Sequence, residues 1–262
     1  MRKSEKILLL LVLAVSLFLL FFFIFRGVDI SEYYPDLVSG FSMTMGLYLF
    51  ALFLGLGLGI VLAISRHYGG PLVTRIATAF IEFERGTPLL AQVYAFTILP
   101  YALAIPTAFI SWEIVLPDIY GIQRIVLDTR ILLCALALGL NSAAYQAEYF
   151  RGSLSSLSAG QTLAAQSIGM TKRQEIRYVA LPQSLRRVIP AWSNEAVYLP
   201  VYTCVAYFVG VAEFLSASTL VVARTYQALI VYFLTAIVFL VLVGLISWLL
   251  NHIYERIRIP GL

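Results

Sequence analysis

Charged residues are scarce in this chain. Of its 262 residues, 12% are Asp, Glu, Lys or Arg, whereas 61% are hydrophobic. An ordinary soluble domain carries about twice that charged share. So little polar surface cannot cover a water-soluble globule, and the composition therefore places the chain among integral membrane proteins.

Cysteine and histidine are also rare. Cys134 and Cys204 lie far apart in apolar stretches, which predicts neither a disulfide framework nor a zinc site. His67 and His252 have no second ligand at metal-like spacing, so we expect no metal centre. A P-loop and a nucleophile with its base are likewise missing from the sequence, so we expect no catalysis by this chain.

Apolar runs, by contrast, are long. Six of them could each cross a hydrocarbon layer about 30 Å thick as a helix. Because backbone polar groups in lipid must be satisfied internally, we expect an all-α transmembrane bundle. The first run is longer than a signal-peptide core and lacks an A-x-A-like cleavage site, so we interpret it as an anchor. The predicted spans are residues 7–25, 38–64, 88–110, 131–147, 188–210 and 226–250.

Basic residues are unevenly divided between the two sides of these spans. With both termini on one side, that side holds 14 of the 18 Lys and Arg residues. The positive-inside rule then predicts cytoplasmic termini and a cytoplasmic location for the long basic loop. The net charge of +4 is explained by these topology determinants rather than by nucleic-acid binding.

The basic loop at about 148–187 carries clear helix signals. Ser158 with Gln161 predicts a capping box, and Gly169 predicts a C-terminal stop, so a helix of about ten residues fits between them. Its small apolar side either fits a groove on another protein or lies against its own chain. That side consists of Ala164, Ala165 and Ile168.

Further local signals concern helix limits and helix packing. Thr171 with Gln174 predicts the start of a second short helix, which Pro182 limits. Gly55 and Gly59 lie within a predicted span, where small residues one turn apart favour close approach of another helix.

Two acidic residues stand out near the last predicted spans. Glu195 lies in or near residues 188–210, and an ionisable group at membrane depth is costly. Its role is therefore either functional or that of an internal hydrogen-bond acceptor. Glu213 and Arg224 flank the short external connection before the last span, where solvation of Glu213 is the alternative to a functional role.

Several motifs in the right order resemble those of binding-protein-dependent permeases. Residues 85–92 resemble the R-G-T-P-L-L-x-Q motif of the polar amino acid branch, and residues 145–152 resemble its Y-x-A-E-x-x-R-G motif. The matching residues in these motifs and beyond are Arg85, Gly86, Thr87, Pro88, Gln92, Tyr145, Glu148, Arg151, Asn194, Glu195 and Glu213. The basic loop resembles the family's EAA loop through Gly160, Gln161, Leu163, Ala164, Ala165, Ile168, Gly169, Leu181 and Pro182.

The resemblance implies a MetI-like permease fold with five core helices in residues 38–262. Residues 1–37 would add a cytoplasmic tail, an extra transmembrane helix and an external loop. The implied protein is the membrane subunit of an ATP-binding-cassette importer for polar amino acids, located in the cell membrane. Implied partners are two copies of an ATP-binding subunit, a second permease subunit and an extracytoplasmic amino-acid-binding protein. ATP and Mg would be bound by the ATP-binding subunit, and this chain would hold no cofactor.

The sequence also departs from the family pattern. Leu163 stands where the EAA loop usually has glutamate, and Val201 stands where L-L-K-x-T-S has lysine. The first departure favours pairing with a different permease chain that keeps its glutamate, although an ATPase groove adapted to leucine would permit a homodimer. A transporter working without ATP is the other functional class, but the internal repeats expected of many such folds are not apparent in the sequence.

Overall fold

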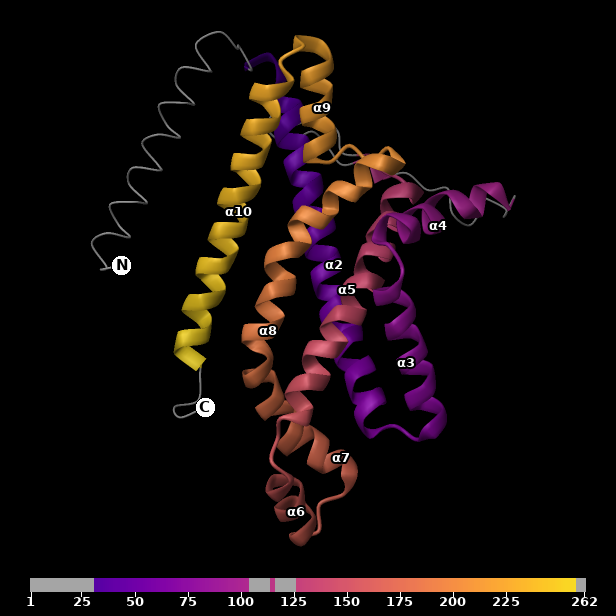
Figure 1. Ribbon diagram of the computed structural model, residues 1–262, viewed down its shortest axis with the longest axis vertical. Coiled ribbons are helices and arrows are strands. Elements are labelled where there is room, and N and C mark those ends of the chain that lie inside the picture. Colours follow the sequence, from indigo (N-terminus) through magenta and orange to yellow (C-terminus); the bar gives the residue numbers. More distant parts are fainter. Residues whose placement is uncertain (1–30, 104–113, 116–125, 258–262) are drawn as a thin grey trace, which may run out of the picture.

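The computed structural model describes residues 31–103, 114–115 and 126–257, and these residues are almost entirely helical (Figure 1). The prediction of an all-α bundle is confirmed, with one two-residue strand pair added, in which Ile114 faces Leu127 and Val115 faces Val126 in antiparallel register. The elements are a 3-10 turn η1 (Ser31–Tyr33), α2 (Tyr34–Tyr68), α3 (Pro71–Gly86), α4 (Leu89–Ala102), β1 (Ile114–Val115), β2 (Val126–Leu127), α5 (Thr129–Ser155), α6 (Ala159–Ser167), α7 (Lys172–Glu175), a π turn η3 (Ile176–Ala180), α8 (Leu181–Tyr202), a 3-10 turn η4 (Thr203–Val209), α9 (Phe214–Thr225) and α10 (Ala228–Ile257).

Three described helices are long and apolar enough to cross a membrane, and a bent pair gives a fourth candidate. The three are α2, α5 and α10, which contain the predicted spans 38–64, 131–147 and most of 226–250. The bent pair joins Lys172–Val209 to Phe214–Thr225 at 56° and contains the predicted span 188–210. The predicted span 88–110 corresponds in its described part to the shorter helix α4, and 7–25 lies outside the described residues.

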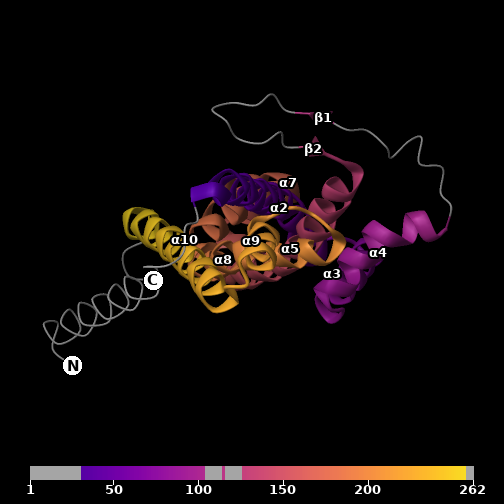
Figure 2. The ribbon, with the colours of Figure 1, turned by 90° about the horizontal axis from the view of Figure 1, so that it is seen from above.

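Helices α2 and α5 share the most extensive contact between two helices in the described part of the chain, and Figure 2 shows them from above, grouped with α8 and α9. A Cβ atom added at Gly59 would lie 3.1 Å from the Ala143 carbonyl oxygen, and one added at Gly55 would lie 2.4 Å from Gln146 Nε2. The two helices therefore approach as closely as glycine permits, which confirms the predicted packing role of Gly55 and Gly59. A Cβ atom added at Gly57 would meet nothing within 4 Å, so Gly57 lies on a side of α2 that does not pack closely against α5.

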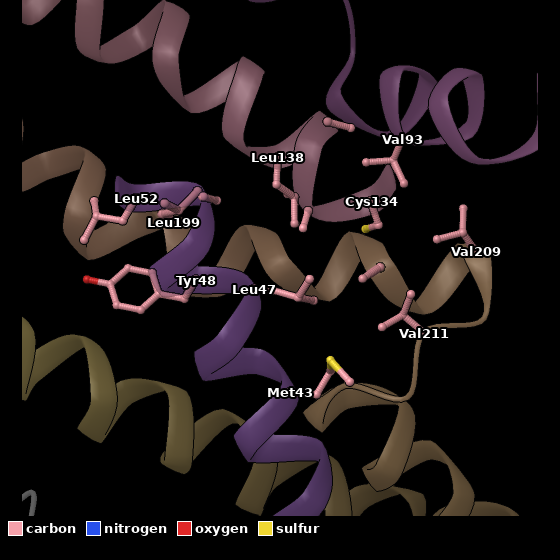
Figure 3. Close-up of a cluster of buried hydrophobic side chains, with 14 of the residues drawn as sticks. Met43, Leu47, Tyr48, Leu52, Val93, Cys134, Leu138, Leu199, Val209 and Val211 are labelled. Atoms are coloured by element: carbon pink, nitrogen blue, oxygen red, sulfur yellow. The ribbon is translucent and has the colours of Figure 1, made fainter. Parts of the chain in front are cut away.

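The main core cluster lies between α2, α5, α8 and η4 (Figure 3). Leu47 of α2, Leu138 of α5 and Leu199 of α8 are all almost completely buried there. Lipid tails are as apolar as these side chains, so close packing rather than exclusion of water holds the cluster together. The outer surface of α10 is apolar and exposed, as expected for a helix in contact with lipid or another membrane chain.

Two sequence predictions about element limits are corrected. Pro182 does not end the helix that begins near Thr171, because η3 and α8 continue it without a break and Pro182 lies in the first turn of α8. Proline has no backbone N–H to donate, and its ring clashes with the preceding turn of an α-helix. The π turn directly before Pro182 changes the hydrogen-bond pattern there and makes room for the ring. The connection before the last span is not a simple external loop either, because it holds the twelve-residue helix α9 packed against α2 and α10.

Candidate coupling and translocation site

Helix α6 lies at the end of the molecule farthest from α9 and is joined to the bundle through α7 and η3 (Figure 1). Gly169 ends it in a left-handed conformation with φ of 78°. The Met170 N–H donates to the Ala165 carbonyl at 3.1 Å, and the Gly169 N–H donates to Gln166 at 2.9 Å. This pair of bonds is a Schellman motif, so the predicted stop at Gly169 is confirmed.

The predicted capping box at the start of α6 is wrong. Ser158 occupies the N-cap position, but its side chain accepts no capping hydrogen bond. The Gln161 side chain instead accepts a 3.2 Å hydrogen bond from Gln183 Nε2 on α8. A long-range partner therefore replaces the local one, and it ties α6 to the beginning of α8.

The exposed side of α6 differs from the predicted one. Ala165 is buried against its own chain, whereas Leu163 and Ile168 are 61% and 74% exposed. Ala164 is exposed between them, which leaves a small residue flanked by two large apolar side chains. The surface available to another protein thus includes Leu163 in place of Ala165.

The second predicted capping box is confirmed. Thr171 Oγ1 accepts from the Gln174 N–H, and Gln174 Oε1 accepts a 2.8 Å hydrogen bond from the Thr171 N–H. Beyond this cap, α7, η3 and α8 run on together, so α6 is followed by one continuous helical segment, Lys172–Val209. Leu181 and Pro182 lie at the junction where the π turn becomes α8.

The turn between α3 and α4 is clamped by hydrogen bonds from Gln92. Its Nε2 donates to the Glu84 carbonyl and to Thr87 Oγ1, each at 2.6 Å. Asn141 of α5 donates at 3.0 Å both to Gln92 Oε1 and to the same Glu84 carbonyl. Gly86 ends α3 and Pro88 precedes α4, so this motif builds a rigid corner fastened to α5.

A second cluster of motif residues centres on Glu148 of α5. Its carboxylate pairs with Arg66 of α2, with Arg151 at 2.9 Å and with Arg85 of α3 at 4.0 Å. The Arg85 guanidinium also lies 5.3 Å from the centre of the Tyr145 ring, within cation–π range. One half-buried acidic group therefore holds the ends of three helices together, and the separate motifs at 85–92 and 145–152 meet in space.

Asn194 and Glu195 are adjacent in sequence but face different sides of α8. Glu195 is only 5% exposed and accepts a 2.7 Å hydrogen bond from Ser142 of α5. Asn194 is exposed and lines a cavity between α8 and α10. The predicted internal hydrogen bond of Glu195 is thus present, and the motif divides into one buried and one accessible residue.

Glu213 is completely buried, so its predicted alternative as a solvated group is wrong. It is the N-cap of α9 and accepts 2.8 Å hydrogen bonds from the Leu215 and Ser216 backbone N–H groups. Thr44 of α2 also contacts it, at 3.5 Å. A charged cap at a helix N-terminus complements the helix dipole, which explains how the carboxylate is accommodated. Arg224 lies 3.9 Å from Asp36 of α2.

The polar residues that complete the Glu195 network were not among the predicted site residues. Gln146 Nε2 donates to Ser142 Oγ at 3.0 Å, and Gln146 Oε1 accepts from Trp192 Nε1 at 2.7 Å. Ser142 and Gln146 are four residues apart within a predicted span, and this spacing places both polar side chains on the same side of a helix. The sequence therefore contained a signal for this pair. No local spacing in the sequence indicates the role of Trp192, because its partner Gln146 lies on another helix.

Comparison with known proteins agrees with this geometry. Residues 55–259 match the family described as binding-protein-dependent transport system inner membrane component. The chain belongs to this family. It is therefore the membrane-embedded component of a transport system that depends on a binding protein, a multi-pass membrane protein and not an enzyme.

Two relatives and one solved structure illustrate the similarity. The chain is 28% identical to the glutamine transport system permease protein GlnP of Escherichia coli (strain K12), over 86% of this chain and 94% of that protein. It is 30% identical to the probable amino-acid permease protein YxeN of Bacillus subtilis (strain 168), over 85% and 91%. A crystal structure of an amino acid ABC transporter with histidines matches with a TM-score of 0.72 at 26% identity, over 88% of this chain and 100% of that one.

Proposed function

We propose that this chain is the permease subunit of an ATP-driven importer that moves polar amino acids delivered by an extracytoplasmic binding protein. The observation that carries the proposal is its similarity, over nearly their whole length, to relatives named for amino-acid transport. The cluster of motif residues around Glu148 supports it, because residues of two separate motifs meet at one ion-paired site.

We propose α6 as the element that docks onto the ATP-binding subunit. Its exposed surface of Leu163, Ala164 and Ile168 has the size and apolar character of a helix that enters a protein groove. ATP and Mg²⁺ are bound by that partner, which carries out the hydrolysis, and this chain needs no cofactor of its own. Gly160 and Gln161 belong to the same helix, with Gln161 anchoring it to Gln183.

The helical segment that follows α6 supplies the route for coupling. When the ATP-binding subunits close, α6 moves with its groove, and the capped, continuous segment Lys172–Val209 moves as one body. Glu195 fastens this segment to α5 through Ser142, so the displacement reaches the centre of the bundle. Both termini and α6 lie on the cytoplasmic side in this arrangement, consistent with the basic residues near α6.

We further propose that the transporter pairs this chain with a different permease chain. Among the described residues between 152 and 194, Glu175 is the sole acidic side chain, and it is buried, so α6 offers its groove no carboxylate. A homodimer would repeat that loss at both ATPase contacts, each of which could otherwise gain roughly 1.5–3 kcal/mol from a charge-assisted hydrogen bond. A second chain that keeps glutamate at the equivalent position preserves one such contact.

Purification from a host that expresses the whole transport system tests these assignments. The complex is solubilised in mild detergent through a tag on this chain, and its intact mass is measured. The expected composition is one copy of this chain, one different permease and two ATP-binding subunits. Two copies of this chain with two ATP-binding subunits, in a fully active complex, would reject the heterodimer, and absence of any ATP-binding subunit would reject the function.

A further inference from the structure

Helices α8 and α10 lie side by side (Figure 1). A cavity of about 370 Å³, open on one side, lies between them. Ligand sites for small molecules begin at about 300 Å³, so the space is large enough for an amino acid. Six of its lining residues carry hydroxyl or amide groups. They are Ser193, Asn194, Tyr198, Ser247, Asn251 and Tyr254.

A cavity lined by this many hydroxyl and amide side chains is unusual in this part of the molecule. Residue Asn194 belongs to the segment Lys172–Val209, and Asn251 belongs to α10, one of the three most apolar candidate spans. Polar side chains on such helices are costly when they face lipid, so they normally face other protein or a water-filled passage. Both asparagines are exposed, and neither has a hydrogen-bonding partner among the described side chains that would account for its position.

The lining residues determine which solutes fit. None of the residues that line this cavity in the described part of the chain is Asp, Glu, Lys, Arg or His. A solute with a charged side chain would enter without a counter-ion, which is expensive in a medium of low dielectric constant. Every amino acid brings the same ammonium and carboxylate, so their desolvation cost does not distinguish one substrate from another, and an uncharged polar side chain adds no further buried charge.

We infer that this cavity is a binding station for the transported substrate, and that it selects amino acids with uncharged polar side chains. The inference rests on the proposed function and adds to it the residues and the substrate class. Hydroxyl and amide groups supply several modest hydrogen bonds and no fixed charge. Such a site binds a solute well enough to admit it and weakly enough to release it, as a passage requires.

The position of the cavity suggests where on the route it lies. Its lining begins at Pro190, one helical turn after Arg186, and ends at Tyr254, next to the end of α10. Both lie toward the end of the bundle that holds α6, which we propose to be cytoplasmic. A cationic side chain would in addition approach Arg186 and Arg187, so we expect lysine and arginine to pass poorly.

The test uses the complete transporter with its ATP-binding subunits and binding protein in proteoliposomes. In a parallel series without the binding protein, equilibrium binding of each amino acid to the detergent-solubilised transporter is measured, so that the selectivity of the binding protein does not mask that of the permease. Uptake with the binding protein present and binding without it are measured for glutamine and for arginine, with the unmodified protein, Asn251→Asp and Asn194→Asp. His252→Asp is the matched control, because it places the same charge on the same turn of α10 outside the cavity lining.

Glutamine should be preferred by the unmodified permease, and each Asn→Asp variant should raise the arginine-to-glutamine ratio by about tenfold. The control should leave that ratio unchanged. Equal ratios for all four proteins, a matching shift in His252→Asp, or a preference of the unmodified permease for arginine would each overturn the inference. The two Asn→Asp variants lie on different helices, so failure of one to insert leaves the other to decide. Absence of any ATP-dependent uptake by the unmodified protein with its binding protein present would instead contradict the proposed function.

Discussion

The Ser142 hydroxyl on α5 donates a 2.7 Å hydrogen bond to the Glu195 carboxylate on α8. The same hydroxyl accepts from Gln146, which in turn accepts from Trp192, so a chain of polar side chains crosses between the two helices inside an apolar bundle. A buried carboxylate without such donors would carry a large desolvation cost. Ser142 therefore fixes the position of α8 relative to α5.

Replacing Ser142 should weaken the bundle. The variant Ser142→Ala removes the donor and leaves the Glu195 oxygen without a partner, which should lower the free energy of unfolding by about 1–3 kcal/mol. Thermal unfolding in detergent measures the effect. Ser42→Ala is the control, because Ser42 bonds only the Val38 carbonyl of its own helix. Identical unfolding temperatures for the two variants would show that the Ser142 contact contributes nothing.

The close approach of α2 and α5 should make the stability of the bundle sensitive to substitution at Gly59 but not at Gly57. In Gly59→Ala the new methyl group would lie 2.9 Å from Gln146 Cβ and 3.1 Å from a backbone oxygen, so the helices must separate. We expect a loss of about 1–3 kcal/mol in unfolding free energy, as for overpacked cores. Gly57→Ala meets nothing within 4 Å and should be neutral or slightly stabilising. Equal stability of the two variants would contradict the described packing.

Overfilling the exposed side of α6 should separate ATP hydrolysis from transport. Ala164→Trp places a large ring between Leu163 and Ile168, where the proposed ATPase groove has room for a methyl group. Membrane insertion should be normal, while transport and substrate-stimulated hydrolysis should fall at least tenfold, an effect equivalent to about 1.4 kcal/mol or more. Leu72→Trp on α3, at a position that is 70% exposed, is the control for a bulky surface residue. Normal transport by Ala164→Trp would refute docking through this surface.

The distribution of basic residues predicts the orientation of the chain. A cysteine in a tag after Leu262 should resist an impermeant thiol reagent in intact cells and react after the membrane is opened. A cysteine placed at Ser167 on α6 should behave in the same way, because both sites lie on the proposed cytoplasmic side. Labelling of either site in intact cells would reverse the assignment.

Features that depend on local sequence could be predicted well. The ends of the short helices near Gly169 and Thr171 follow from capping chemistry that acts over a few residues, and the packing role of Gly59 follows from its place in an apolar run. The predicted capping box at Ser158 is wrong because the Gln161 side chain is hydrogen-bonded to Gln183 on another helix. No local pattern contains that partner.

Features that depend on which side of a helix faces a neighbour could not be predicted. Asn194 and Glu195 form one motif in sequence, but successive residues of an α-helix are rotated by about 100°. Asn194 therefore lines the cavity, whereas Glu195 is hydrogen-bonded to Ser142. Glu213 was given a solvated loop position as its alternative because α9 was not predicted, and glutamate is not one of the residues that usually mark an N-cap. The Glu148 cluster unites α2, α3 and α5, so only the fold could reveal it.

The most direct test of the account is the energy source for uptake. The complete transporter is reconstituted in proteoliposomes with its binding protein on the outside, and glutamine uptake is measured with ATP inside, without ATP, and with an imposed proton or sodium gradient in place of ATP. The account predicts that uptake requires ATP inside and is not driven by either gradient. Uptake driven by a gradient in the absence of ATP would contradict it.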